Sequence, residues 1–389
     1  MPQLFAPPGL DLDDHRALAE LAEIRDSLAS SLRAPRRWTG GLRRTSAARA
    51  IRGSNTIEGY TVTDSDAAAA VDGEPPLSAD EQTWAEITAY RRVMTYVLNV
   101  ATDPSFVIDE SVLRSMHFML LEHDLNKSPG RYRTSAAQVH DDRAHDDRAH
   151  RDVYEGPAAD DVPDLMRELA RQLAEPGPDH PLVSAAMAHL NLVAIHPFRD
   201  GNGRMARALQ TMVLAGDRVV EPPFSSIEEW LGANTQDYYD VLAAVARGGW
   251  HPDRDTALWV KFNLRAHHMQ AQTTRRRFAE AERQWARLDD LTTRHRLPDR
   301  LADALFDALL GFRVTRHGYL NHVTVDERTA TRDLVRAAEA GLLEARGERR
   351  GRYYLAGESL RAIQDELRAA RQPLIDPYPT LVAEIRLAK

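Results

Sequence analysis

Residues 196–204 read His196-Pro197-Phe198-Arg199-Asp200-Gly201-Asn202-Gly203-Arg204, and they stand between two segments with the periodicity of buried helices. Apolar residues recur at helical spacing over residues 182–195 and again over residues 204–215. Because both neighbouring segments must pack, the sequence predicts a loop held between two helices. Phe198 is expected to fix this loop to the hydrophobic core.

This loop carries the groups that a phosphate site needs. Gly201 and Gly203 flank Asn202 where a helix begins, so backbone N–H groups can point outward together beside the positive end of the helix dipole. Arg204 and Arg207 lie three residues apart on one face of that helix and can reach further phosphate oxygens. The pattern predicts an anion site suited to a diphosphate.

Two further side chains of the loop add a metal ligand and a base. Asp200 is a hard carboxylate of the kind that binds a Mg²⁺ ion bridging two phosphates. His196 is the only side chain of the loop that titrates near neutral pH. The loop is therefore predicted to combine a phosphate cradle, a metal ligand and a base.

Residues 196–207 match the signature His-Pro-Phe-x-Asp/Glu-Gly-Asn-Gly-Arg-x-x-Arg at every defined position, and the chain resembles the Fic (Fic/Doc) family. The likeness spans roughly residues 1–265 and implies a mainly α fold, a Fic-type helical bundle with a β-hairpin flap. Residues 130–133 resemble the start of the flap, which aligns the target segment by strand addition. The tandem pentapeptide DDRAH at 141–150 lengthens that flap.

The resemblance implies transfer of AMP from ATP, the co-substrate, to a Ser, Thr or Tyr hydroxyl of a protein. His196 would deprotonate the attacking hydroxyl, and Asp200 would hold Mg²⁺ on the α- and β-phosphates. The backbone of Gly201, Asn202 and Gly203 would stabilise charge on the α-phosphate in the transition state.

The remaining nucleotide contacts are also taken from the resemblance. Arg204 would hold the β-phosphate and Arg207 the γ-phosphate. Trp230 and Tyr239 lie in the region that helps to enclose the nucleotide base in this family.

Residues 54–59, Ser-Asn-Thr-Ile-Glu-Gly, fit the inhibitory motif Ser/Thr-x-x-x-Glu-Gly/Asn of the autoinhibited Fic proteins. Ser54 and Glu58 are its defining residues here. Glu58 is expected to pair with Arg207 and to occupy the guanidinium that would otherwise take the γ-phosphate. ATP would then bind with its α-phosphate turned away from in-line attack.

Four parts are predicted along the chain. Residues 1–105 form an N-terminal helical region with the inhibitory helix, and residues 106–265 the Fic catalytic core. Residues 266–297 form a connecting helix, and residues 298–389 a small winged helix-turn-helix domain.

The winged domain is locally basic. Residues 312–354 hold nine arginines and six acidic residues, and the helix and hairpin expected after residue 326 resemble the winged helix-turn-helix often appended to Fic proteins. DNA contact would place Arg328, Thr329 and Arg332 toward base edges. A protein-interaction or dimerisation module with the same fold is the alternative.

The whole chain of 389 residues carries a net charge of −8 and no cysteine. This charge excludes a chain-wide nucleic-acid binder, although a local basic patch is compatible with it. The absence of cysteine excludes disulfides, thiolate metal sites and cysteine nucleophiles. No signal peptide or membrane span is expected, which favours a cytoplasmic protein.

Two classes of function remain. The first is an autoinhibited, Mg²⁺- and ATP-dependent protein adenylyltransferase, a nucleotidyltransferase whose targets can include itself. The second is a DNA-binding regulator that uses the Fic site to sense nucleotide; the intact His196 favours the first, because a sensor needs no base. Transfer of another nucleotidyl group, removal of AMP with Glu58 orienting a water, and formation of a homodimer stay open.

Overall fold

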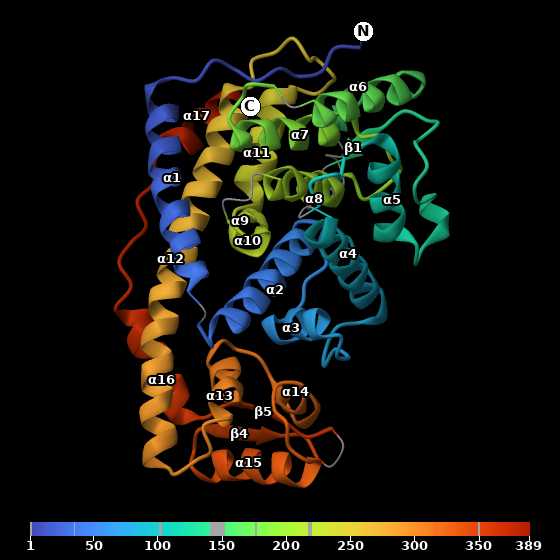
Figure 1. Ribbon diagram of the computed structural model, residues 1–389. Helices are drawn as coiled ribbons and strands as arrows, with labels where there is room; N and C mark the ends of the chain where they lie inside the picture. The colour runs from blue at the N-terminus through green and yellow to red at the C-terminus, as the bar shows by residue number, and fades with distance from the viewer. Residues whose placement is uncertain are drawn as a thin grey trace.

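The computed structural model describes residues 2–34, 36–100, 103–140, 152–175, 177–216, 220–348 and 351–389. These residues are mainly helical, with a two-stranded and a three-stranded antiparallel sheet, which confirms the predicted fold class. Figure 1 shows a larger helical body and a small module at its lower end, joined by the long helix α12 (Ala257–Arg294). No helix in this described part of the chain is long and apolar enough to cross a lipid bilayer.

Four helices build the N-terminal region: α1 (Leu12–Arg33), α2 (Thr39–Ile57), α3 (Asp64–Asp72) and α4 (Glu81–Val100). All four lie within residues 1–105, for which the sequence analysis expected a helical region, and the shortest of them is α3. Local capping explains this helix, because the side chain of Thr63 accepts a hydrogen bond from the N–H of Asp66, and Gly73 ends the helix with a φ of 73°.

The centre of the molecule holds α5 (Glu110–Leu121), α6 (Val162–Ala174), α7 (Pro181–Ile195) and α8 (Asn202–Ala215), with the 3-10 turns η1 (Leu125–Lys127) and η2 (Ala159–Asp161). Strands β1 (Gln138–His140) and β2 (Asp152–Glu155) form an antiparallel hairpin. The resemblance placed the start of the flap at residues 130–133, whereas the first strand begins at Gln138. The DDRAH repeat lies outside the described residues.

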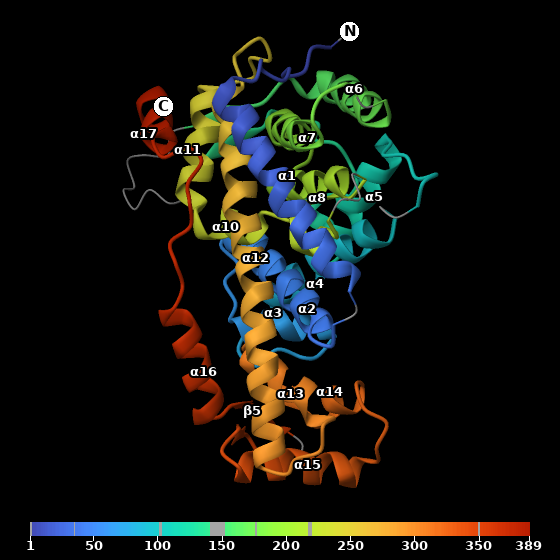
Figure 2. The ribbon, with the colours of Figure 1, turned by 60° about the vertical axis from the view of Figure 1, so that its left-hand side comes forward.

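Three shorter helices precede α12: α9 (Pro222–Ser225), α10 (Glu228–Ala233) and α11 (Thr235–Ala246). Helix α12 packs along α1 for much of its length and then continues to the lower module (Figures 1 and 2). The boundary expected between residues 265 and 266 lies inside this continuous helix. The predicted connecting helix is therefore continuous with residues 257–265 of the predicted catalytic core.

The lower module contains α13 (Leu301–Leu309), β3 (Val314–Thr315), α14 (Arg316–Leu320), α15 (Glu327–Glu339), β4 (Leu343–Arg346), β5 (Tyr353–Ala356) and α16 (Glu358–Ala369). Its strands form one antiparallel sheet in the order β3-β5-β4. Helix α15 and the hairpin of β4 and β5 lie where a helix and a hairpin were expected after residue 326, and the winged helix-turn-helix assignment stays a prediction.

The end of the chain, which the prediction assigned to the module of residues 298–389, packs away from the rest of that module. Figure 2 shows the last segment running back along α12 to α17 (Leu381–Ala388), beside α11. Tyr378 Oη donates to Asp14 Oδ1 at 2.8 Å, and Arg265 pairs with Asp376 at 2.8 Å. Leu381 and Ile385 of α17 are buried. These contacts attach the last residues to the helical body.

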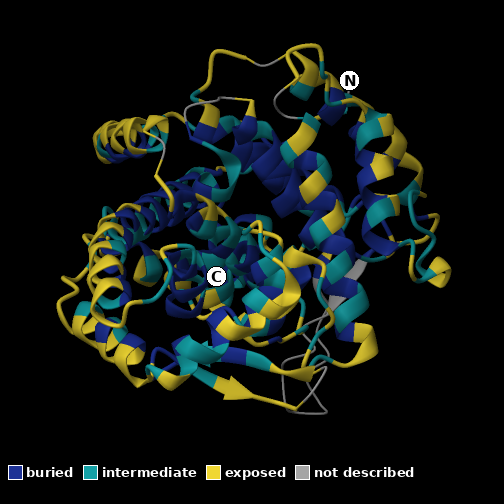
Figure 3. Cartoon of the chain, turned by 60° about the horizontal axis from the view of Figure 1, so that its bottom comes forward, coloured by how far each residue is buried: buried dark blue, intermediate teal, exposed yellow. Residues whose placement is uncertain are grey.

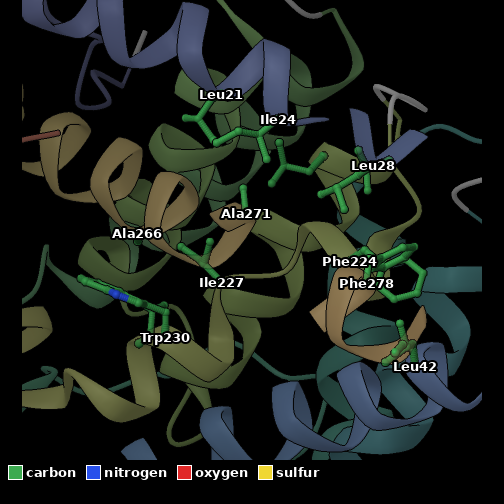
Figure 4. Close-up of a cluster of buried hydrophobic side chains, with 14 of the residues drawn as sticks. Leu21, Ile24, Leu28, Leu42, Phe224, Ile227, Trp230, Ala266, Ala271 and Phe278 are labelled. Carbon is green, nitrogen blue, oxygen red and sulfur yellow. The ribbon is translucent and has the colours of Figure 1, made fainter. Parts of the chain in front are cut away.

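One large hydrophobic cluster fills the space between α1, α12 and the helices near α9. Figure 3 shows buried residues on the inward faces of the helices and exposed residues outside. In Figure 4, Leu21, Ile24 and Leu28 of α1 face Ala271 of α12. This core packs α12 against the same helical body that contains α7 and α8.

Helix α2 is fixed at both ends. Near its start, Arg44 pairs with Asp307, and Arg37, which precedes the helix, pairs with Asp299 at 3.0 Å and Asp303 at 3.1 Å. All three aspartates belong to the lower module or to the turn before it. The predicted inhibitory helix is therefore in direct contact with the C-terminal module.

Near its other end, α2 crosses α10 at two glycines. A Cβ on Gly53 would lie 2.3 Å from the carbonyl oxygen of Glu228, and a Cβ on Gly232 would lie 2.6 Å from the Cα of Gly53. Only glycine permits backbones to approach this closely. The crossing holds the second half of α2, including Glu58 at its C-cap, in place.

We predict that Gly53→Ala lowers the free energy of unfolding by about 1–3 kcal/mol, because the new methyl group overlaps the backbone of α10. Gly40→Ala is the matched control in the same helix, since a Cβ there meets no atom within 4 Å. This control is expected to keep or slightly raise stability, because alanine favours helix. Denaturant unfolding of the three proteins measures the difference, and equal midpoints for the two variants would contradict the crossing.

Candidate active site

The loop between α7 and α8 is held from inside by Asn202. The side-chain oxygen of Asn202 accepts from the N–H of Phe198 at 2.9 Å, and its amide nitrogen donates to the carbonyl of Phe198 at 2.9 Å. Phe198 is buried, as predicted. The side chain of Asn202 thus shapes the loop, and its contribution to a ligand would come from its backbone.

The start of α8 has the geometry of an anion site. Gly201 has a φ of 76°, and a Cβ at this position would lie 3.1 Å from Leu120. No side chain among the described residues caps the N-terminus of α8 by a hydrogen bond. The N–H groups of a first helical turn have no partners within their own helix, so this turn is suited to an anion.

The carboxylate of Glu58 lies at this helix start. A Cβ on Gly203 would lie 2.6 Å from Glu58 Oε1, and the same oxygen accepts from Arg207 Nη2 at 2.6 Å. The Glu58–Arg207 pair predicted from the sequence is therefore present. The carboxylate of Glu58 therefore lies at a helix N-terminus, a position that favours an anion.

Arg207 is buried and is held by Ser54 as well as by Glu58. Its Nε donates to Ser54 Oγ at 2.8 Å and its Nη2 to the Ser54 carbonyl at 2.9 Å. Burial by itself would lower the pKa of Arg207, but the charge of Glu58 outweighs burial and the pKa is raised. The Nη1 of Arg207 has no hydrogen-bond partner among the described residues, so one donor of this buried cation remains to be used.

Arg204 is paired with an acid that sequence analysis missed. Glu86 of α4 is 1% exposed and binds Arg204, and it also accepts from Tyr60 Oη at 3.1 Å and from Lys127 Nζ at 3.1 Å. Burial by itself would raise the pKa of Glu86. The positive charges of Arg204 and Lys127 outweigh burial and lower the pKa to about 2. The sequence held one indication of this role, since Glu86 is an acidic residue among the buried positions of α4, beside Ile87 and Tyr90.

His117 of α5 also escaped prediction. Its Nδ1 accepts from the N–H of Gly130 at 2.8 Å, so its Nε2 donates to the carbonyl of Asp200 at 2.9 Å. Its ring is stacked on Phe198 with centroids 3.7 Å apart. Burial lowers the pKa of His117 to about 4, so the ring is a neutral support for the loop.

His196 is oriented as a base. It caps α7 with a φ of 50°, and its Nδ1 lies 3.3 Å from the carbonyl of Val193. Because a carbonyl can only accept, Nδ1 carries the proton and Nε2 keeps its lone pair. Burial lowers the pKa of His196, which keeps it neutral at pH 7. Arg133 donates to the carbonyl of His196 at 2.8 Å and so fixes its backbone.

Asp200 supplies the single carboxylate expected for Mg²⁺. Its Oδ1 accepts from the N–H of Gly201 at 2.6 Å, and its Oδ2 pairs with Lys127 Nζ at 2.8 Å. The described residues contain no group of three or more His, Cys, Asp or Glu side chains arranged to hold a metal. One carboxylate completed by nucleotide phosphates and water is the usual Mg²⁺ environment, so these residues fit the ion when a nucleotide is bound.

The structure separates the two aromatic residues predicted to enclose the base. Tyr239 lies beside the inhibitory motif, with Oη 3.3 Å from the carbonyl of Ile57. Trp230 is 9% exposed and packs against Phe262 of α12, with centroids 5.5 Å apart, in the cluster of Figure 4. Helix α10 turns this side chain toward α12 and into the core, and its contact with a nucleotide base stays a prediction.

Together these features bring a helix N-terminus, a histidine, a carboxylate and two buried arginines to one loop. Residues 107–214 match the Fic/DOC family. The chain is 30% identical over 204 residues to a protein adenylyltransferase Fic from Nematostella vectensis, which covers 51% of this chain and 43% of that protein. The chain is therefore similar to Fic/DOC proteins over its central region. It spans less than half the length of this curated relative.

Solved structures show the same fold. A Fic family protein from Desulfovibrio desulfuricans G20 aligns with a TM-score of 0.55 and 26% identity, over 91% of this chain and 99% of that one. A Fic domain containing signaling protein from Bacteroides thetaiotaomicron VPI-5482 aligns with a TM-score of 0.51 and 21% identity, over 66% of this chain and 96% of that one. The first likeness extends over nearly the whole chain.

The neutral His117 predicts an acid sensitivity. Its pKa is lowered from 6.5 to about 4 on folding, so its contribution is complete above pH 6.5 and is lost as the pH falls toward 4. Because of His117, the free energy of unfolding should fall by about 2 kcal/mol between pH 7 and pH 5. His117→Gln, although less stable at pH 7, should lose less stability over this range.

Urea unfolding of both proteins at several pH values measures this difference. The other histidines with lowered pKa values, His189, His196 and His267, are present in both proteins, so their contributions cancel. Identical pH dependence in the two proteins would contradict a neutral, supporting His117.

Proposed function

We propose that this protein transfers AMP from ATP to a hydroxyl side chain of a protein, and that Glu58 holds it inactive. The observation that carries the proposal is the Glu58 carboxylate at the start of α8, bound to Arg207 at 2.6 Å and lying against Gly203. A carboxylate there takes the place of a phosphate. The relatives named protein adenylyltransferase Fic support this class of reaction.

The transfer itself needs one proton acceptor and one set of phosphate contacts. The target hydroxyl oxygen forms a bond to the α-phosphorus, the bond from that phosphorus to the β-phosphate bridging oxygen breaks, and pyrophosphate leaves. The hydroxyl proton goes to Nε2 of His196, which its Nδ1 contact to Val193 keeps free to accept it. The backbone N–H groups at Asn202 and Gly203 stabilise the charge that develops on the α-phosphate.

The side chains around this backbone would hold the rest of the nucleotide. Asp200 would hold Mg²⁺, which supplies positive charge to the α- and β-phosphates. Arg204 would bind the β-phosphate after partial release from Glu86, and Arg207 the γ-phosphate after release from Glu58. Tyr239, beside the inhibitory motif, and Trp230, packed on α12, remain the candidate contacts for the base.

Glu58 would inhibit by competition for Arg207. The γ-phosphate and the carboxylate carry the same sign of charge and need the same guanidinium, so both cannot occupy it. Ser54 adds two hydrogen bonds to Arg207 and keeps the guanidinium turned toward Glu58. ATP bound beside Glu58 would lack its γ-phosphate contact and would not place the α-phosphate for attack.

The first test is incubation of the full chain with α-labelled ATP and Mg²⁺. Glu58→Gly should raise AMP transfer to the chain itself or to proteins of a cell lysate at least about tenfold, the equivalent of removing 1.4 kcal/mol of competition. Adding His196→Ala to this variant should reduce transfer by about 10²–10⁴-fold, because the base is lost.

Asp13→Gly serves as the control, since this exposed acid lies at the start of α1 and pairs only with Arg16 in the described structure. It should behave as the unmodified chain. Equal labelling by the unmodified chain and Glu58→Gly would refute the inhibitory role. No labelling by Glu58→Gly with ATP or any other α-labelled nucleoside triphosphate would refute nucleotidyl transfer.

A second candidate function is DNA binding by the lower module. Arg328 and Arg332 are exposed one turn apart on α15, and neither pairs with an acid among the described residues. Helix α15 lies at the far end of the molecule in Figure 1, away from the active site. Two unpaired arginines on one exposed helix face are suited to phosphate or base contact.

If this module binds DNA, the double variant Arg328→Ala/Arg332→Ala should weaken retention on duplex DNA and lower the slope of log affinity against log salt by about 1–2. Arg167→Ala/Arg171→Ala on α6 is the matched control, with two exposed arginines at the same spacing. Equal salt slopes for both double variants would reject α15 as the contact.

A further inference from the structure

Lys127 is held between two acids of the site. Its Nζ lies 2.8 Å from Asp200 Oδ2 and 3.1 Å from Glu86 Oε1. Its side chain is 22% exposed, and Glu86 is 1% exposed. Among its neighbours, Arg204 binds the other oxygen of Glu86, so positive and negative groups alternate along Arg204, Glu86, Lys127 and Asp200.

The turn η1, of which Lys127 is the last residue, fixes the backbone position of Lys127. Asp124 caps η1 by accepting from the N–H of Asn126. The carbonyl of Asn126 accepts from Arg199 Nη1 at 3.0 Å, which joins this turn directly to the phosphate-binding loop. The ammonium group is therefore presented to Asp200 by backbone that the loop itself anchors.

Both oxygens of Asp200 are engaged in this arrangement. The N–H of Gly201 uses Oδ1 and Lys127 uses Oδ2. A divalent ion on this carboxylate would stand close to an ammonium group of the same sign of charge. At such distances two like charges repel strongly in a partly buried site.

We propose that Lys127 is the resident counter-ion of Asp200, which a divalent cation must displace, so that Lys127 sets the cation concentration at which Asp200 binds metal. Glu86 retains the ammonium when Asp200 is taken, because it lies within 3.1 Å of the same nitrogen. Lys127 is thus a positioning residue that acts through Asp200. The role rests on the proposed function of Asp200 as the metal ligand.

Metal binding without nucleotide tests this directly. The free Mn²⁺ signal in electron paramagnetic resonance is titrated with the full chain, and binding that disappears in Asp200→Asn is assigned to Asp200. Lys127→Met should tighten this Asp200-dependent binding by about threefold to fivefold, the size expected for loss of a partly exposed ion pair. Lys127→Arg, which keeps the charge, should leave the affinity near that of the unmodified chain.

Lys261 offers the matched control, because it also bridges two aspartates, Asp11 at 2.6 Å and Asp14 at 2.9 Å. Lys261→Met should not change Asp200-dependent Mn²⁺ binding. Unchanged or weaker binding in Lys127→Met would overturn the proposal, as would the absence of any Asp200-dependent binding in both proteins.

A second measurement separates this proposal from the proposed function. In the Glu58→Gly background, Lys127→Met should lower the Mg²⁺ concentration that half-saturates AMP transfer by a similar factor. Tighter Mn²⁺ binding without AMP transfer would leave Lys127 as the counter-ion and refute the enzyme. AMP transfer with the same Mg²⁺ requirement in both proteins would support the enzyme and overturn the role of Lys127.

Discussion

The ion pair between Glu58 and Arg207 joins residues 149 positions apart and places a carboxylate at the start of α8. It connects the C-cap of α2 to the first turns of α8, over Gly203, where no larger residue fits. The neighbouring charged side chains are paired in the same way, Arg204 with Glu86 and Asp200 with Lys127. Each charged side chain expected to contact a nucleotide or its metal, namely Arg204, Arg207 and Asp200, already has a partner of opposite charge within the chain.

The architecture explains why this pair is firmly placed. Helix α2 is fixed to α10 where Gly53 meets Gly232, and to the lower module where Arg44 meets Asp307. Helix α12 runs from the core to that same module, and the last residues return to the core through α17 (Figure 2). The element that carries Glu58 is therefore part of the main packing of the molecule, in contact with both the catalytic helices and the C-terminal module.

Much of the site could be predicted because it is local in sequence. Residues 196–207 contain the loop, the base, the carboxylate and both arginines, and the motif around Glu58 supplied its pairing with Arg207. The supports could not be found in this way. His117 meets Asp200 across 83 residues and Glu86 meets Arg204 across 118, so neither pattern is visible before the chain folds. The packing of Trp230 on α12 was likewise not visible from the sequence.

The central claim is that Glu58 occupies the place of the γ-phosphate. It is tested most directly by calorimetric titration of the unmodified chain and of Glu58→Gly with ATP and with ADP, in the presence of Mg²⁺. The account predicts that the γ-phosphate adds little affinity in the unmodified chain, and that ATP binds Glu58→Gly at least about tenfold more tightly than ADP does. The same ratio of ATP to ADP affinity in both proteins would contradict it.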